Sequence, residues 1–370
     1  MTTIATINSE TNNIATQSIQ SVINSSGSGG GSSFNVNTAT ITFPVETKAA
    51  DITKWEEKQL NIEPLANRQY IGIFYRNGIY FIYGFKIFVY STDGVNWYDL
   101  NKTMSDLTMA YDHMCYADGK YVIIADGKKF KYSIDGVNWH EVQVSSTITR
   151  TWGAICYGGD KFVAVPWDNN KGVYSSDGIT WSDFDLPNSR RWYDILYGKG
   201  PIGTGTFVAT AGDGYIAYAN SYLSNLSSWT EVRVVNADGC KWTAGCYAND
   251  KFVIASPQGY VAYSTNGYEW QTVSCGTRNW YSMVYAEGKY VAIACSSPYV
   301  MYSTDAITWT EVQLDNDRDW YDICYADNKF IILSYDQNMI AQTKHVTESK
   351  TMTIPDALSA VFSSVNTLSL

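Results

Sequence analysis

The sequence predicts an all-β protein, a seven-bladed β-propeller whose last blade is completed by an N-terminal strand. Two observations predict the blades: a motif that recurs about every 40 residues, and the strand-and-turn character of each repeat. A third observation predicts closure, because the strand that the last repeat lacks is found ahead of the first repeat.

The repeat is carried by two motifs. The first reads Tyr-Ser-x-Asp-Gly-x-x-Trp, and its strong copies end 42 residues apart at Trp97, Trp139 and Trp181. Weaker copies end at Trp229, Trp270 and Trp309. The second motif is an aromatic residue followed five residues later by Tyr. It occurs at Tyr70/Tyr75, Tyr111/Tyr116, Trp152/Tyr157, Trp192/Tyr197, Trp242/Tyr247, Trp280/Tyr285 and Trp320/Tyr325. Seven copies predict seven blades.

Each repeat resolves into four short strands. In the second repeat, aromatic and β-branched residues predict strands at 111–117, 121–125, 128–133 and 139–144. Asp-Gly pairs separate the first three of these segments. Such pairs are strong hairpin signals because both residues adopt positive φ at low cost.

The seventh repeat ends at Thr343 without a fourth strand. Residues 51–56 resemble residues 306–311, and Trp55 lies 42 residues before Trp97. We therefore expect residues 51–56 to complete the last blade, which closes the ring and removes two exposed strand edges.

The composition divides the chain into three parts. Residues 1–46 form an arm rich in Ser, Thr, Asn and Gly, residues 47–344 form the propeller, and residues 345–370 form a C-terminal arm. After Pro355 the apolar spacing predicts a short amphipathic helix. Its apolar face consists of Leu358, Val361, Phe362 and Val365. We expect this face to dock onto a partner, with packing back onto the propeller as the alternative.

Charge and composition exclude several functions. The net charge of −10 argues against a nucleic-acid partner, which requires a basic face. No apolar run approaches the ~18–20 residues of a membrane span, so no membrane insertion is expected. The seven Cys contain no CxxC pair and the three His fall in unrelated contexts, so we expect no metal and no cofactor.

The first motif resembles the Asp box of sialidase-like propellers. It is more similar to the shortened Ser-Thr-Asp-Gly-x-x-Trp repeat of bacteriophage tail and other surface propellers, over about residues 51–343. We expect a structural role, in which Asp accepts backbone N–H groups, Gly supplies positive φ and Trp covers the base of the blade. The residues expected to play this role are Asp93, Trp97, Asp135, Trp139, Asp177, Trp181, Asp305 and Trp309.

A second set of residues surrounds the start of each inner strand. An Arg stands two residues before the aromatic residue in five repeats, whereas Met109 and Cys240 take this place in the other two. Strand polarity puts these positions on the face opposite the Asp boxes, around the central channel. Since Arg binds anions bidentately and aromatic rings stack on sugars, we expect an anionic or sugar ligand. The candidate ligand-binding residues are Arg68, Tyr70, Arg150, Trp152, Arg190, Trp192, Trp242, Arg278, Trp280, Arg318 and Trp320.

A structural alternative exists for the Arg residues. Each would then bridge neighbouring blades through Asp194, Asp319, Asp322 or a carbonyl group. The fivefold recurrence favours this alternative, although the two roles are compatible.

Catalysis is not expected. Sialidases need three Arg from different blades, a Tyr–Glu nucleophile pair, an Asp acid and an Arg-Ile-Pro signature, and no such set stands out. The resemblance instead implies a non-enzymatic, tail-associated protein of a bacteriophage virion, assembled in the host cytoplasm. Its arms would anchor it to other virion proteins, and its open face would contact the host surface or a glycan. A secreted or surface carbohydrate-binding propeller is the alternative, and a sialidase-type glycosidase is the third possibility.

Overall fold

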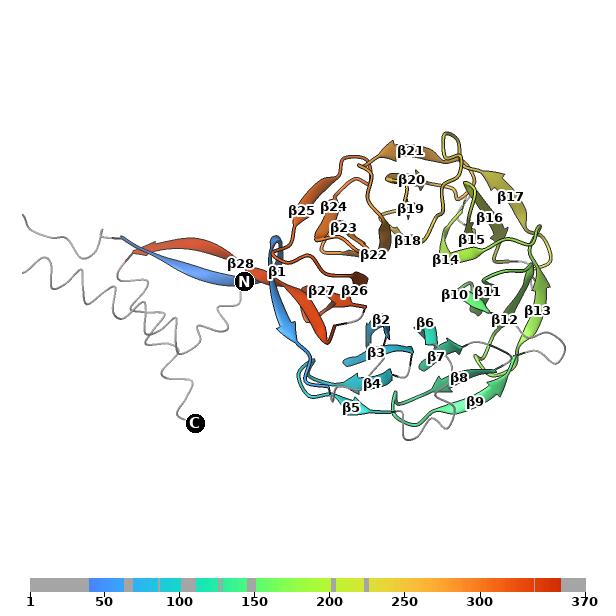
Figure 1. The fold of residues 1–370 in the computed structure, drawn as a ribbon, viewed down its shortest axis with the longest axis horizontal. Helices are drawn as coiled ribbons and strands as arrows, with labels where there is room; N and C mark the ends of the chain where they lie inside the picture. The colour runs from blue at the N-terminus through green and yellow to red at the C-terminus, as the bar shows by residue number, and fades with distance from the viewer. Residues whose placement is uncertain are drawn as a thin grey trace, which may run out of the picture. The chain divides into compact units, whose positions relative to one another are not determined.

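The computed structural model describes residues 40–62, 69–85, 87–100, 111–125, 127, 129–144, 151–200, 204–222, 226–335 and 337–353. The predicted Arg68, Arg150 and the helical face of Leu358, Val361, Phe362 and Val365 lie outside these residues. The described chain forms seven four-stranded antiparallel sheets, and Figure 1 shows them arranged as the blades of a ring. The predicted seven-bladed propeller is confirmed.

The first three blades follow one another along the chain, each with its first strand innermost (Figure 1). Blade 1 contains β2 (Gln69–Arg76), β3 (Ile79–Phe85), β4 (Ile87–Ser91) and β5 (Tyr98–Asp99). Blade 2 contains β6 (Tyr111–Ala117), β7 (Lys120–Ala125), β8 (Lys129–Ser133) and β9 (His140–Gln143). Blade 3 contains β10 (Trp152–Gly158), β11 (Lys161–Pro166), β12 (Lys171–Ser175) and β13 (Ser182–Asp185).

The remaining blades have the same order. Blade 4 contains β14 (Trp192–Lys199), β15 (Gly205–Ala211), β16 (Tyr215–Asn220) and β17 (Thr230–Arg233). Blade 5 contains β18 (Ala244–Ala248), β19 (Lys251–Ser256), β20 (Tyr260–Ser264) and β21 (Gln271–Ser274). Blade 6 contains β22 (Trp280–Ala286), β23 (Lys289–Ala294), β24 (Tyr299–Ser303) and β25 (Thr310–Gln313). Blade 7 contains β26 (Trp320–Ala326), β27 (Lys329–Ser334), β28 (Met339–Thr353) and β1 (Thr40–Gln59).

The core lies between the blades rather than within one layer. The second strand of each blade is packed on both faces, so its sequence is a continuous apolar run and not an alternating one. In β11, for example, Phe162, Val163, Ala164 and Val165 are all fully buried. The ring therefore has seven similar apolar interfaces in place of one central core.

The Asp-box turns are closed by side-chain hydrogen bonds. In blade 2, Oδ1 of Asp135 accepts the N–H groups of Val137 (2.9 Å) and Asn138 (2.8 Å). Gly136 adopts a φ of 77°, which an L side chain rarely tolerates, and its carbonyl accepts Nε1–H of Trp139 at 3.0 Å. Hydrogen bonds from Asn138 and from the backbone of Val137 hold the pKa of Asp135 well below its usual range. The charged form of Asp135 therefore stabilises this turn.

The ring is closed by the two ends of the propeller sequence, as predicted. Strand β1 pairs with β28 as the outermost strand of blade 7. Nε1–H of Trp55 donates to the carbonyl of Ile52 at 2.8 Å, the same contact that Trp139 makes in its own turn. Asn338 donates to the carbonyl of Leu60 at 2.7 Å and accepts the hydroxyl of Tyr70 at 3.1 Å, which links blade 7 to blade 1.

The chain separates into two compact units. One is the propeller, Ala50–Lys344, and the other consists of the chain ends, Met1–Ala49 and His345–Leu370. Within the second unit, residues 40–49 belong to β1 and residues 345–353 belong to β28, and Oγ1 of Thr47 donates to the carbonyl of Val346 at 3.1 Å. Residues 40–46 of the predicted N-terminal arm are thus part of a strand. In the described part of the chain, no helix is long and apolar enough to cross a bilayer.

Candidate functional site

The tryptophans that were expected to line the channel mouth are buried instead. Trp152 is 1% exposed, and the equivalent residues of blades 4 to 7 are fully buried. Each of these rings packs against the preceding blade: Trp192, for instance, lies against Ala154 and Val163 of blade 3. Because they fill the space between blades, these rings are not available for stacking on a sugar.

The predicted cationic face is also corrected. Nε of Arg190 donates to Oε1 of Glu231 at 2.6 Å and a second nitrogen donates to Oε2 at 3.0 Å, while the guanidinium lies 3.7 Å above the ring of Tyr215. Glu231 is on the outermost strand of the same blade. Arg190 therefore extends over the rim of blade 4, and its charge is neutralised there by a bidentate pair.

Two further blades repeat this arrangement. Arg278 makes the same bidentate contact with Glu311, at 2.8 and 3.0 Å. Arg318 donates to Glu57 at 2.8 Å and also to Gln337. These three Arg residues pair with a Glu of their own blade and not with Asp194, Asp319 or Asp322, so these pairs are not the bridges between neighbouring blades that the structural alternative expected. The available signal was an acidic residue two positions after the last Trp of every repeat that has this Arg: Asp99, Asp183, Glu231, Glu311 and Glu57.

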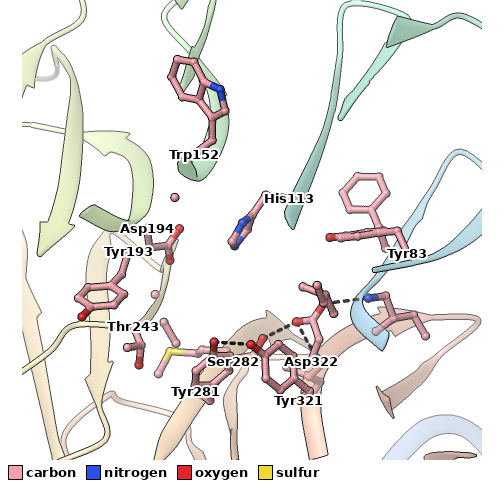
Figure 2. A pocket seen from close by; sticks show the side chains of 18 of the residues that line it. Tyr83, His113, Trp152, Tyr193, Asp194, Thr243, Tyr281, Ser282, Tyr321 and Asp322 are labelled. Carbon is pink, nitrogen blue, oxygen red and sulfur yellow. Dashed lines mark hydrogen bonds between the residues drawn. The ribbon is translucent and has the colours of Figure 1, made fainter. Parts of the chain in front are cut away.

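A cavity of about 460 Å³ occupies the centre of the ring (Figure 2). Its wall is built by the inner strands of all seven blades. Each inner strand contributes at least one residue to this wall. In blade order, the wall includes Ile73, His113, Gly153, Asp194, Ala244, Ser282 and Asp322. The channel is therefore a pocket with a unique lining, although the blades that form it are repeats.

A β-bulge near the start of the inner strands selects which side chains reach this cavity. In β14, Trp192 pairs with Ala211 and Asp194 pairs with Thr210, so Tyr193 is left without a partner residue in the ladder. The same shift occurs in β2, β6, β10, β22 and β26. Such a bulge redirects the side chains that follow it. In β14, β22 and β26 the buried Trp is thus followed by two residues that line the cavity.

Aromatic residues do surround the cavity, but they stand one position after the predicted ones. The hydroxyl groups of Tyr281 and Tyr321 hydrogen bond at 2.6 Å, with ring centroids 4.5 Å apart. Tyr321 also packs on Tyr335 at 4.8 Å, and Trp167 packs edge-on against Tyr193 at 5.0 Å. Burial raises the pKa of Tyr321, so its hydroxyl group is neutral.

Two carboxyl groups lie in the wall of the cavity. Asp322 accepts the hydroxyl of Ser282 (2.6 Å) and the N–H groups of Ile73 (2.8 Å) and Ile323 (2.9 Å). These donors come from blades 6, 1 and 7, so the carboxyl group ties three blades together. Burial raises the pKa of Asp322 to about 6, although the three hydrogen bonds act in the opposite direction.

Asp194 and His113 complete the polar part of the lining. Burial raises the pKa of Asp194 to about 7, against hydrogen bonds from the backbone of Ile195 and Gly245, and the nearby charge of Asp322 adds to the increase. Burial lowers the pKa of His113 to about 4, so its imidazole is neutral. Its Nδ1 has no hydrogen-bond partner among the described residues.

Sequence reasoning missed this set, although a signal was present. The residue two positions after the second-motif aromatic differs from blade to blade, unlike the repeated positions around it. These seven residues are Gly72, His113, Ala154, Asp194, Ala244, Ser282 and Asp322. A position that varies between otherwise similar repeats indicates residues whose role is specific to one blade. Across the described residues, no three His, Cys, Asp or Glu side chains gather as a metal site requires.

The Arg–Glu pair at the rim gives a first prediction. Glu231→Gln should lower the free energy of unfolding by about 1–2 kcal/mol, because it weakens charge-assisted hydrogen bonds in a partly buried place. Glu141→Gln is the matched control, since Glu141 holds the same position in blade 2, where Met109 replaces the Arg and the pair with Lys129 is exposed. Urea titration should show a loss under about 0.5 kcal/mol for this control. Equal losses for both variants would contradict the assigned role.

The raised pKa of Asp194 gives a second prediction, on pH dependence. The folded state holds a proton that the unfolded chain releases above pH 3.8, so Asp194 makes stability fall as the pH rises from about 4 to about 7. In Asp194→Asn, the decrease in the free energy of unfolding between about pH 4 and about pH 7 should be smaller by on the order of 1–2 kcal/mol. Denaturant titrations at several pH values measure the slope.

Asp177→Asn is the control for this prediction. Although burial opposes it, hydrogen bonds from the backbone of Thr180 and Ile179 lower the pKa of Asp177 to about 2. Its contribution is therefore lost only as the pH falls below about 4 towards 2. An unchanged slope in Asp194→Asn would show that Asp194 is ionised at neutral pH.

The comparisons with known proteins support the fold and do not indicate a function. No family model and no curated protein matches the chain. Virginiamycin B lyase from Staphylococcus aureus has a similar structure, with a TM-score of 0.66 and 12% identity over 79% of this chain and 100% of the lyase. YCF48 from Cyanidioschyzon merolae gives a TM-score of 0.58 at 12% identity, over 78% of this chain and 98% of YCF48. The WD40 propeller domain of Doa1 gives 0.57 at 10% identity, over 79% of this chain and 98% of the domain.

These neighbours are neither sialidases nor bacteriophage proteins, and they include a lyase beside a WD40 domain. At such identities a shared fold does not decide between an enzyme and a binding protein. The chain shares the seven-bladed propeller with them, and its function has to be argued from its own channel.

Proposed function

We propose that this chain is a non-enzymatic attachment protein of a bacteriophage virion, associated with the tail, whose central pocket binds a host-surface glycan. The observation that carries the proposal is the aromatic cluster of Tyr281, Tyr321 and Tyr335 beside the pocket, together with Trp167 and Tyr193. Aromatic rings of this kind pack on the apolar faces of sugars, and their hydroxyl groups offer hydrogen bonds to the ligand.

The charges around the pocket specify the class of glycan. Arg190, Arg278 and Arg318 are paired with Glu at the rim, whereas Asp194 and Asp322 face the cavity. An anionic sugar would meet carboxyl groups and no cation here. A neutral or basic glycan fits better than the anionic ligand that the sequence suggested.

The acids themselves support a structural and binding role. Asp322 receives three hydrogen bonds from three blades, on both carboxyl oxygens. A carboxylate held in this way stabilises the ring and is poorly placed to attack or protonate a glycosidic bond, which requires a group directed at the substrate. The second candidate is nevertheless a glycosidase, because a carboxyl group with a pKa raised to about 7, like Asp194, is typical of a general acid.

The virion role is supported by the shortened Asp-box repeat and by the chain ends. The described part of the second unit is a pair of strands, residues 40–49 of β1 and 345–353 of β28. A two-stranded ribbon is marginally stable alone in water, so contact with neighbouring subunits would stabilise it. A secreted carbohydrate-binding propeller would not need this partner.

Glycan binding is tested by removing one ring. Tyr281→Ala should weaken binding of host-surface polysaccharide about fivefold, because one aromatic–sugar contact is worth roughly 1 kcal/mol. Tyr222→Ala is the control, since this side chain is 69% exposed and lies outside the cavity lining. Isothermal titration calorimetry measures both variants. Turnover of fluorogenic glycosides that is lost in Asp194→Asn would replace this proposal with the glycosidase.

Assembly is tested separately. A chain without residues 1–39 should still fold, because these residues lie ahead of β1, but it should no longer be incorporated into virus particles. Purified particles made with full-length and shortened chains can be compared by quantitative immunoblotting. Equal incorporation would contradict an anchoring role for the N-terminal arm.

A further inference from the structure

We propose that the group recognised inside the central pocket is a primary ammonium group, which donates to the carboxylate of Asp194 beside the imidazole of His113. Figure 2 shows both side chains directed into the same cavity. This inference rests on the proposed binding function of the pocket and names the chemistry of its ligand.

The hydrogen-bonding groups of the cavity favour a ligand that donates. The hydroxyl of Ser282 donates to Asp322 at 2.6 Å and that of Thr243 donates to the carbonyl of Trp280 at 3.0 Å. Since each hydroxyl has one hydrogen, both offer only lone pairs to a ligand. These two hydroxyl groups and the carboxyl groups of Asp194 and Asp322 therefore present acceptors, which the N–H donors of a ligand would satisfy.

The charge of the cavity lining favours a cation. Among the described residues that line the cavity there is no Lys or Arg, but there are two Asp. The rings of Tyr193 and Tyr281 also face it, and the negative faces of aromatic rings attract cations. A primary ammonium group satisfies both conditions because it has three N–H donors and a positive charge. A quaternary ammonium group satisfies only the charge, and a neutral sugar only the donors.

The described residues around Asp194 are acids and neutral groups, with no Lys or Arg among them. Asp194 is faced by Asp322 on β26, by His113 on β6 and by the thiols of Cys156 on β10 and Cys246 on β18, with Tyr193 beside it on β14. Burial keeps both thiols protonated by raising their pKa. A bound ammonium would be the one positive charge in this group, so its binding should release a proton from Asp194 near neutral pH.

The test uses two sugars that differ in charge on the same ring, glucosamine and N-acetylglucosamine, in calorimetric titrations near neutral pH. Glucosamine should bind the full-length protein at least about tenfold more tightly, and titrations in two buffers of different ionisation enthalpy should show proton release. In Asp194→Asn the preference and the proton release should both disappear. Nα-acetyl-lysine amide, added as a third ligand, tells whether the ammonium group comes from a sugar or from a protein side chain, and binding of either supports the inference.

Folding controls separate a lost site from a lost structure. Asp194→Asn should keep the near-ultraviolet circular dichroism of the parent, and Tyr222→Ala, whose side chain lies outside the cavity lining, should leave the binding of both sugars unchanged. Equal binding of the two sugars, or a preference that survives in Asp194→Asn, overturns the inference. If N-acetylglucosamine binds equally well and Tyr281→Ala weakens it, the glycan-binding function stands without the ammonium site. If no ligand binds and polysaccharide binding also fails, both proposals fail.

Discussion

The rest of the molecule depends on the large aromatic residue at the start of each inner strand. Trp192 and its equivalents fill the gap between adjacent blades, so they set the spacing of the ring. Because that residue is fixed, the bulge that follows places Tyr193 and then Asp194 on the wall of the channel. The residue two positions before it, Arg190, is carried over the blade and reaches the outermost strand. One packing contact thus organises the rim and the pocket.

The fold was predictable because its signals are local and repeated. Asp-Gly turns such as Asp135-Gly136 and the 42-residue spacing define strands and blades without knowledge of distant contacts, and the displaced Trp55 reveals the closing strand. The site was less predictable, because strand polarity indicates which face a residue occupies but not whether it points to the channel or to the rim. For this reason Arg190 was expected at the channel but lies at the rim. In addition, the sequence pattern does not reveal the β-bulge after Trp192, which makes Tyr193 the aromatic residue that lines the cavity.

Repetition and function are separated within single strands. The aromatic residue and the Asp box recur because every blade meets the same packing problem, whereas the position two residues after the aromatic is His113, Asp194 or Ser282 in different blades. Asp322 has both kinds of role, since it faces the pocket and joins three blades. This double role limits how freely the pocket can evolve. A substitution of Asp322 that suits a new ligand would also remove hydrogen bonds that join the blades.

The pairing of β1 with β28 also has a consequence for how the protein is made. Strand β1 precedes the six other blades in the chain, and its partner β28 follows them. During synthesis β1 therefore has no partner strand for its hydrogen-bonding groups until β28 has been made, so closure of the ring is the last pairing to become possible. Until then, β1 is an exposed strand edge that a chaperone or another nascent chain could bind.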